Sequence, residues 1–286
     1  MRSHVHRTPG VGCIAAVLAV VALGALAGCD VDFFGSGASR ATLTYTEDAR
    51  AAYNEAMQTF RAREWEDARA LFAEVKRLFA YSRYARLAEL RIADVDFEQE
   101  KYTDAIVGYR DFVQNHRTDS DVEYAKYRLV KALYLDIDDT FLLPPQEERD
   151  QATTLEAFRE IKIFLREFPR SHYRTDVRYM FDVVTGRLVR HELYVARYYL
   201  GADQFEAAVA RCDYAVKMYP GSGLDPEALV LKGETLLKMK KDEEARAVFT
   251  QVIKDYGGPF ATTAKSFLHE MDTRNKAVPK TQSKGG

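Results

Sequence analysis

Two groups of polar residues have part of the pattern that metal sites need. A His-Glu pair at 191–192 begins the His-Glu-x-x-His motif of zinc proteases, but Val195 stands where the second histidine ligand belongs. The acidic segment 136–147 is similar to a calcium loop, but Phe141 occupies the position that needs glycine for a sharp turn. The sequence has no glycine-rich phosphate loop and no Gly-x-Ser-x-Gly elbow. We therefore expect no metal, no cofactor and no enzymatic activity.

Cys29 is the third candidate for chemistry. Two arginines and then an uncharged apolar run, 11–28, precede it. The run ends in Leu-Ala-Gly-Cys at 26–29, which is similar to a bacterial lipobox, where the cysteine thiol accepts diacylglycerol and cleavage frees its amine for a further acyl chain. Two or more chains anchor a protein stably. We expect a lipoprotein signal peptide at 1–28 and a lipidated tether at 29–45, facing the periplasm.

The predicted signal peptide explains the state of the other cysteines but does not decide which membrane the protein reaches. Of the three cysteines, Cys13 leaves with the signal peptide, and Cys212 remains as the free thiol. Its place on an apolar helix face indicates a small core residue. Asp30, directly after the lipidated cysteine, is similar to an inner-membrane retention signal. We expect the outer membrane, with the inner membrane as the alternative.

The charge balance bears on the partners. The chain of 286 residues has a formal net charge of −2, with 47% hydrophobic and 29% charged residues. A nucleic-acid binder usually shows a strong basic excess, so we expect no nucleic-acid partner for this chain. The composition is that of an ordinary globular protein rather than a disordered one.

The elements that must position these residues form an internal repeat. Alanine recurs near the start of five segments, and apolar residues stand four and seven places later, on the same helix face. The five alanines are Ala68, Ala105, Ala157, Ala208 and Ala245. A bare tetratricopeptide unit has ~34 residues, so two intervals are lengthened, around 136–150 and 173–200. Gly186 is a candidate bend in the second.

We therefore predict an all-α tetratricopeptide-repeat solenoid of about five helix pairs plus a C-terminal capping helix. The expected pairs are 46–62 with 65–79, 83–98 with 102–115, 121–137 with 151–168, 173–200 with 204–218, and 225–239 with 242–255. The cap is expected at 260–271, because solenoids need closed ends. Repeats 1–2 would span 46–119, repeat 3 would span 120–171 with an inserted loop at 138–150, repeats 4–5 and the cap would span 172–271, and 272–286 would be a disordered basic tail.

The inner face of such a stack binds peptides or protein partners. Residues on the first helices that point away from their pair partners are the candidates for a peptide groove. They are Met57, Phe60, Arg61, Leu90, Asp94, Phe97 and Glu98. Core packing is the alternative for each aromatic residue.

Four features together carry a family resemblance. They are the lipobox cysteine with its short tether, Tyr53-x-x-Ala56 with Trp65-x-x-Ala68, Arg149-Asp150-Gln151 leading to Ala157 and Phe168-Pro169-Arg170-Ser171, and Glu192-x-x-x-Ala196-x-Tyr198-Tyr199 with Ala207-Ala208-x-x-Arg211 and Tyr219-Pro220. From about Tyr53 to Met271 the chain resembles the BamD (YfiO) family of outer-membrane-protein assembly lipoproteins. It departs from that family at 79–82, where Phe-Ala-Tyr-Ser replaces the usual Tyr-Pro-x-Ser.

The resemblance implies a scaffold of the β-barrel assembly (BAM) machinery. In that family the N-terminal repeats form a pocket for extended segments of unfolded outer membrane barrel proteins. The C-terminal repeats contact the periplasmic POTRA region of BamA, and other BAM lipoproteins are further partners. Arg211, with Tyr198 and Glu192, is then the candidate contact with BamA, because a guanidinium suits a carboxylate partner. An intramolecular ion pair is the alternative for Arg211.

Two other classes of envelope protein share such repeats. A protein of the Tol or peptidoglycan system usually has an N-terminal coiled coil, and residues 30–45 show no heptads. A secretin pilot lipoprotein is usually shorter and lacks two C-terminal repeats. Both remain alternatives from the sequence.

Overall fold

The computed structural model describes residues 36–137 and 144–277, with side chains from Thr42 to Arg274 in these ranges. The predicted signal peptide, Cys29, Asp30, the first six residues of the predicted insertion (138–143) and the last nine residues lie outside the described residues. The chain divides into two units, 1–51 and 52–286, and all helices that begin after residue 64 lie in the second.

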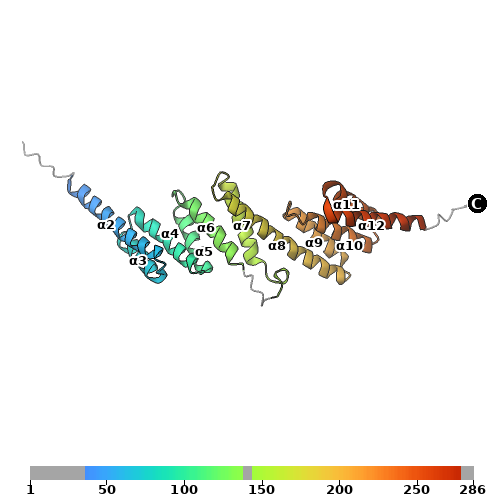
Figure 1. Ribbon diagram of the computed structural model, residues 1–286, viewed down its shortest axis with the longest axis horizontal. Helices are drawn as coiled ribbons and strands as arrows, with labels where there is room; N and C mark the ends of the chain where they lie inside the picture. The colour runs from blue at the N-terminus through green and yellow to red at the C-terminus, as the bar shows by residue number, and fades with distance from the viewer. Residues whose placement is uncertain (1–35, 138–143, 278–286) are drawn as a thin grey trace, which may run out of the picture. The chain divides into compact units, whose positions relative to one another are not determined.

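The described residues form a series of α-helices (Figure 1). In chain order they are α2 (Ser36–Arg61), α3 (Trp65–Leu78), α4 (Arg83–Glu98), α5 (Tyr102–Asn115), α6 (Val122–Leu135), the short 3-10 helix η1 (Gln146–Glu148), α7 (Ala152–Glu167), α8 (Arg174–Gly201), α9 (Phe205–Met218), α10 (Asp225–Lys238), α11 (Asp242–Asp255) and α12 (Gly258–Ala277). From α3 to α12 each α-helix packs against the next, which confirms the predicted all-α solenoid of helix pairs.

Small residues allow the two helices of each pair to approach closely. The five reference alanines predicted from the repeat are all fully buried. At Gly108 in α5, an added Cβ would lie 2.8 Å from the Cβ of Ala93 in α4. At Gly233 in α10, it would lie 2.5 Å from the ring of Phe249 in α11. The alanine and glycine pattern therefore sets the spacing within the pairs.

The turn inside a pair has the same geometry in four of the five repeats. A non-glycine residue with positive φ follows the first helix at Arg63, Glu100, Asp203 and Lys240, with φ between 58° and 62°. The next residue donates its N–H to a carbonyl five residues back, as in Gln204 to Tyr199 at 2.9 Å, which is a Schellman helix end. The third pair has the insertion at this turn.

The insertion in the third pair packs against the lengthened helix α8. Within the insertion, η1 packs on α8, and Nδ1–H of His191 donates to the backbone carbonyl oxygen of Glu147 at 2.7 Å. Arg190 adds an ion pair to Glu147 at 3.7 Å. His191 thus has a structural partner. The helix α8 is continuous through Gly186, where an added Cβ would make ordinary contact with Arg190 at 3.5 Å.

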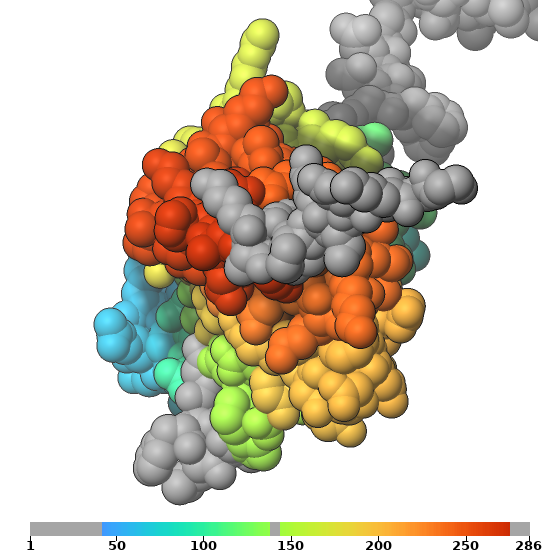
Figure 2. All heavy atoms as spheres, turned by 90° about the vertical axis from the view of Figure 1, so that its right-hand side faces the viewer, coloured from blue at the N-terminus to red at the C-terminus, as the bar shows by residue number. Residues whose placement is uncertain are grey.

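Three hydrophobic cores hold the second unit together. One joins α2 and α3 to α4, the second and largest runs from α4 to α10, and the third joins α10, α11 and α12. Cys212 lies in the largest core with 1% of its surface exposed, so its predicted role as a core residue is confirmed. From the C-terminal side, the orange and red residues of α10–α12 form much of the near face (Figure 2).

Both ends of the helical region were placed wrongly by the sequence. The predicted tether to residue 45 is helical from Ser36, because alanines at 38 and 41 extend a helix that is already nucleated downstream. The cap runs to Ala277, so 272–277 is helix rather than disordered tail. Here Asp272 and Arg274 pair with Arg246 and Asp242 of α11 at 2.7 and 2.8 Å. Among the described residues, no helix has both the length and the hydropathy to span a bilayer.

Replacing Gly233 by alanine tests the close approach within a pair. We expect Gly233→Ala to destabilise the protein by about 1–3 kcal/mol, because the new methyl group overpacks against Phe249. Gly201→Ala is the matched control, since nothing lies within 4 Å of its Cβ position, and it should be neutral or slightly stabilising. Urea unfolding followed by circular dichroism measures both. Equal stability of the two variants would contradict the packing argument.

Candidate functional site

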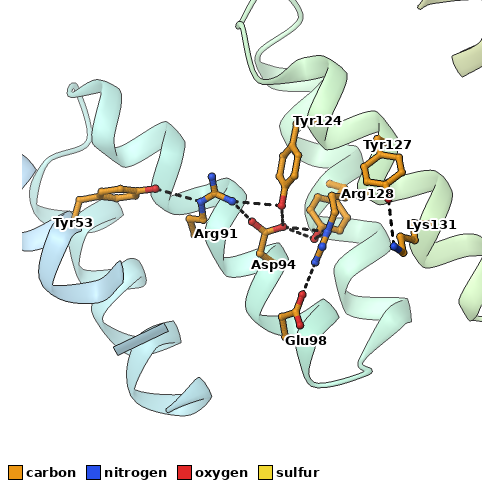
Figure 3. A network of polar contacts seen from close by, with 9 residues as sticks. Tyr53, Arg91, Asp94, Glu98, Tyr124, Tyr127, Arg128 and Lys131 are labelled. Atoms are coloured by element: carbon orange, nitrogen blue, oxygen red, sulfur yellow. Dashed lines mark hydrogen bonds and ion pairs between the residues drawn. The ribbon is translucent and has the colours of Figure 1, made fainter. Parts of the chain in front are cut away.

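Asp94 of α4 is the centre of a buried polar network that joins repeats 2 and 3 (Figure 3). Its side chain is 2% exposed. Oδ1 accepts hydrogen bonds from the hydroxyls of Tyr109 at 2.6 Å and Tyr124 at 2.9 Å. Arg91 pairs with Oδ2, and Arg128 of α6 lies 3.5 Å from Oδ1. The carboxylate is therefore surrounded by donors, which is what a buried charge requires.

The two arginines extend the network to its neighbours. Arg128 donates to Glu98 at 2.9 Å, and its guanidinium lies 3.8 Å from the centre of the Phe97 ring, a cation–π contact. Arg91 donates to the hydroxyl of Tyr53 in α2 at 3.3 Å. Figure 3 shows these side chains converging from α2, α4 and α6. One network thus ties the first three repeats together.

The tyrosines in this network stay protonated. Burial raises the pKa of both Tyr109 and Tyr124 above the usual value of a phenol, and the negative charge of Asp94 raises it further. Each hydroxyl therefore remains a hydrogen-bond donor to Asp94 at every pH at which the protein is used.

Three of the seven predicted groove residues, Leu90, Asp94 and Phe97, are buried, so the face expected to be open is covered at these positions. α5 packs on α4, and the side chains of Tyr124 and Arg128 reach from α6 to Asp94 and Phe97. Met57 and Phe60 pack on the core of repeat 1, where the Phe60 ring stacks edge-on to Trp65 at 5.3 Å. Arg61 is exposed.

A second candidate site lies on α8 and α9. Arg211 donates to Glu192 at 3.1 Å, so the expected alternative, an intramolecular ion pair, is formed. The Glu192 side chain is 9% exposed and that of Arg211 is 42% exposed. The hydrogen bond to Glu192 raises the pKa of Arg211, and a hydrogen bond to Tyr199 adds to the shift. The guanidinium is therefore oriented from one side and accessible from the other.

Exposed side chains of interface type continue this site. Tyr214 and Met218 follow Arg211 at helical spacing on α9 and are 41% and 44% exposed. We call these three residues the α9 face. Tyr198 of α8, also predicted, is 67% exposed and lies beside Tyr199 with ring centroids 5.8 Å apart. Tyrosine, methionine and arginine are the residues enriched in protein–protein interfaces.

The described part of the chain contains no candidate metal site. No group of three or more His, Cys, Asp or Glu side chains that could hold an ion occurs in residues 36–137 and 144–277. The chemistry that the two candidate sites can perform is binding through charge-assisted hydrogen bonds and aromatic contacts.

Comparisons with known proteins give one family. The family model YfiO, described as an outer membrane lipoprotein, matches residues 46–252. The chain is 26% identical over 231 residues to "Outer membrane protein assembly factor BamD" of Caulobacter vibrioides, covering 80% of this chain and 72% of that protein. It is 25% identical over 234 residues to the protein of the same name from Neisseria gonorrhoeae, covering 80% and 86%. The protein of that name from Pasteurella multocida is 26% identical over 195 residues, covering 67% of this chain and 75% of that protein.

A solved structure of the TPR2AB-domain:pHSP90-complex of yeast Sti1 covers 80% of this chain and 95% of its own chain, at 12% identity and a TM-score of 0.36.

Removing the Asp94 carboxylate tests the network. We expect Asp94→Ala to destabilise the protein by about 3–5 kcal/mol, because it leaves two partly buried guanidinium groups without their shared partner. Asp111→Ala, at an exposed position of α5, is the control and should change stability by less than about 0.5 kcal/mol. Chemical denaturation measures both. A small loss at Asp94 would show that the arginines are solvated well enough without it.

Proposed function

The chain belongs to the YfiO family of outer membrane lipoproteins, and from this premise we propose that it is a lipid-anchored scaffold of the β-barrel assembly complex. In this role it binds BamA and assists the folding and insertion of outer membrane barrel proteins. The observation that carries the proposal is the family match over residues 46–252, which includes both candidate sites. The three relatives described above are all named as BamD assembly factors.

The anchor in this proposal is Cys29. Its place after Leu-Ala-Gly and an apolar run supports lipidation, and the family description as a lipoprotein agrees with it. With Asp30 as the next residue, the inner membrane stays the alternative address. The mature chain then acts from the periplasmic face of the membrane without covalent chemistry of its own.

The proposed contact with BamA is the α9 face. Glu192 is nearly buried and fixes the guanidinium of Arg211, so little side-chain entropy is lost when a partner carboxylate binds the exposed side. A planar guanidinium also has donors left for a bidentate partner after one bond to Glu192. In this arrangement Glu192 positions the guanidinium of Arg211, Arg211 binds the partner carboxylate, and Tyr198 adds exposed aromatic surface nearby.

The proposed site for unfolded barrel segments is the accessible rim of the Asp94 network. The side chain of Glu98 is 40% exposed and that of Arg91 is 25% exposed. Lys131, one turn after Arg128 on α6, is 36% exposed and donates to the hydroxyl of Tyr127 at 3.3 Å. Such polar groups, with tyrosine rings beside them, can bind the main chain of an extended segment. Arg61, another residue of the predicted groove, is also exposed.

A pull-down from native membranes tests the scaffold role. In mild detergent, the tagged protein should copurify with BamA, identified by mass spectrometry. Cys29→Ala should lose membrane association and with it most of the BamA, because the acyl chains are the stable anchor. An eluate with Tol, peptidoglycan or secretin components in place of BamA would overturn the proposal while leaving the fold intact.

Reversing the charge of Arg211 tests the contact. Arg211→Glu should weaken binding to the isolated BamA periplasmic region at least tenfold, because it removes the cation and places a second carboxylate beside Glu192. Lys217→Glu, an exposed charge reversal on the same helix, is the control and should bind normally. Helix content by circular dichroism should be unchanged in both. Normal affinity in Arg211→Glu would remove this residue from the interface.

A further inference from the structure

Five exposed arginines lie at the three turns that join one helix pair to the next. These turns connect α3 to α4, α5 to α6 and α7 to α8, and the residues are Arg83, Arg117, Arg166, Arg170 and Arg174. The turns are neighbours in space. Arg86 at the first pairs with Asp119 at the second at 3.1 Å, and Lys126 beyond the second pairs with Glu167 beside the third. We call the five residues the arginine edge.

The charges of the arginine edge are not neutralised within the described residues. None of the five has a carboxylate within ion-pair distance there, whereas the nearby bases Lys76, Arg86 and Lys126 each have one. Arg117 and Arg174 donate to backbone carbonyl oxygens, at 3.3 and 3.4 Å, which leaves their charge unpaired. The edge therefore presents a row of guanidinium groups to its surroundings.

Helix stability does not account for Arg83 and Arg170 in this row. Arg83 is the first residue of α4 and Arg174 is the first residue of α8, where a positive charge opposes the helix dipole. Arg170 belongs to neither of the helices that flank it. Arg166, in the last turn of α7, complements a helix end. Arg117 and Arg174 donate to last-turn carbonyl oxygens of α5 and α7, so they also complement helix ends. Residues that work against local stability indicate a binding role.

An exposed aromatic residue accompanies the charges. Tyr81, in the α3–α4 turn next to Arg83, is 97% exposed, and Leu78 beside it is 48% exposed. Tyrosine with adjacent basic residues is the composition found at membrane–water interfaces, where the ring lies at headgroup level. The charges also follow an edge rather than filling one cleft, which suits many separate phosphates better than one partner side chain.

We propose that the arginine edge binds the headgroup phosphates of an anionic phospholipid surface, with Tyr81 inserted at headgroup level. The proposal deepens the proposed function and rests on its membrane anchor. Acyl chains on a terminal cysteine hold the chain at a membrane without orienting the repeats. Guanidinium groups bind phosphate in a defined, bidentate geometry, so the edge would turn one side of the second unit toward the bilayer.

A dye placed at the edge reports docking. The full protein, purified from membranes, is reconstituted in phosphatidylcholine vesicles with or without phosphatidylglycerol. Ala80→Cys places a thiol in the α3–α4 turn, and Ala62→Cys, at the other end of α3, is the control. Both positions are exposed. Burial raises the pKa of the Cys212 thiol to about 12, so a thiol-reactive, polarity-sensitive dye labels the introduced cysteine at neutral pH.

We expect the dye at position 80, but not at position 62, to report a less polar environment when phosphatidylglycerol is present. Added salt should reverse the change, because surface electrostatics are screened. Arg83→Gln and Arg170→Gln should each lower the ratio of docked to undocked protein about fivefold. Lys238→Gln, which removes an exposed charge at the end of α10, should leave the ratio unchanged.

Two results would overturn the proposal. One is an unchanged signal at position 80 when phosphatidylglycerol is added. The other is a response at position 80 to polyglutamate in phosphatidylcholine vesicles without any response to phosphatidylglycerol, which would assign the edge to an acidic protein segment. The vesicles contain no BamA, so the outcome does not depend on whether the chain assembles barrel proteins.

Discussion

The close approach of the two helices within each pair is the contact on which the structure depends. A fully buried alanine begins the second helix of each of the five pairs, and a glycine at 108 or 233 faces a neighbour that a methyl group would hit. A single pair cannot bury its remaining apolar face, so the pairs stack and form continuous cores. The stack in turn fixes which turns become neighbours, and this brings the arginine edge together from residues far apart in sequence.

The Asp94 network adds orientation to this packing. Apolar contacts within the cores are not directional, and neighbouring pairs could slide or rotate with little loss of buried area. A carboxylate that accepts from Tyr109, Tyr124 and Arg91 at once has one arrangement of helices that satisfies it. The network thus selects among similar packings of the first three repeats at the cost of burying charge.

The sequence predicted the helices well and the candidate groove poorly, for physical reasons that differ. Helix periodicity and buried alanines are local signals, and the α4 and α5 bounds, for example, were placed correctly at 83–98 and 102–115. The predicted helix ends were wrong where a helix continues through residues without a strong hydrophobic pattern, as at 36–45. Asp94 was expected on an open face, because its position on the first helix was expected to point away from the pair partner. Its partners Tyr124 and Arg128 come from the next repeat, and nothing in the local pattern of α4 marks them.

The arginines of this chain differ in burial, and their burial decides what each can do. Arg128, with its side chain 14% exposed, has its donors and its ring contacts within the fold, so it can only stabilise. Arg211 is 42% exposed and is held by a nearly buried glutamate, so it can bind a partner in one fixed direction. Arg83 and Arg170 lie exposed without a carboxylate partner in the described residues, so their charge acts outward and depends on salt. An arginine held like Arg211 suits contact with one protein carboxylate, and exposed arginines such as Arg83 and Arg170 suit a surface with many phosphates. The two proposed contacts therefore rest on two different kinds of arginine.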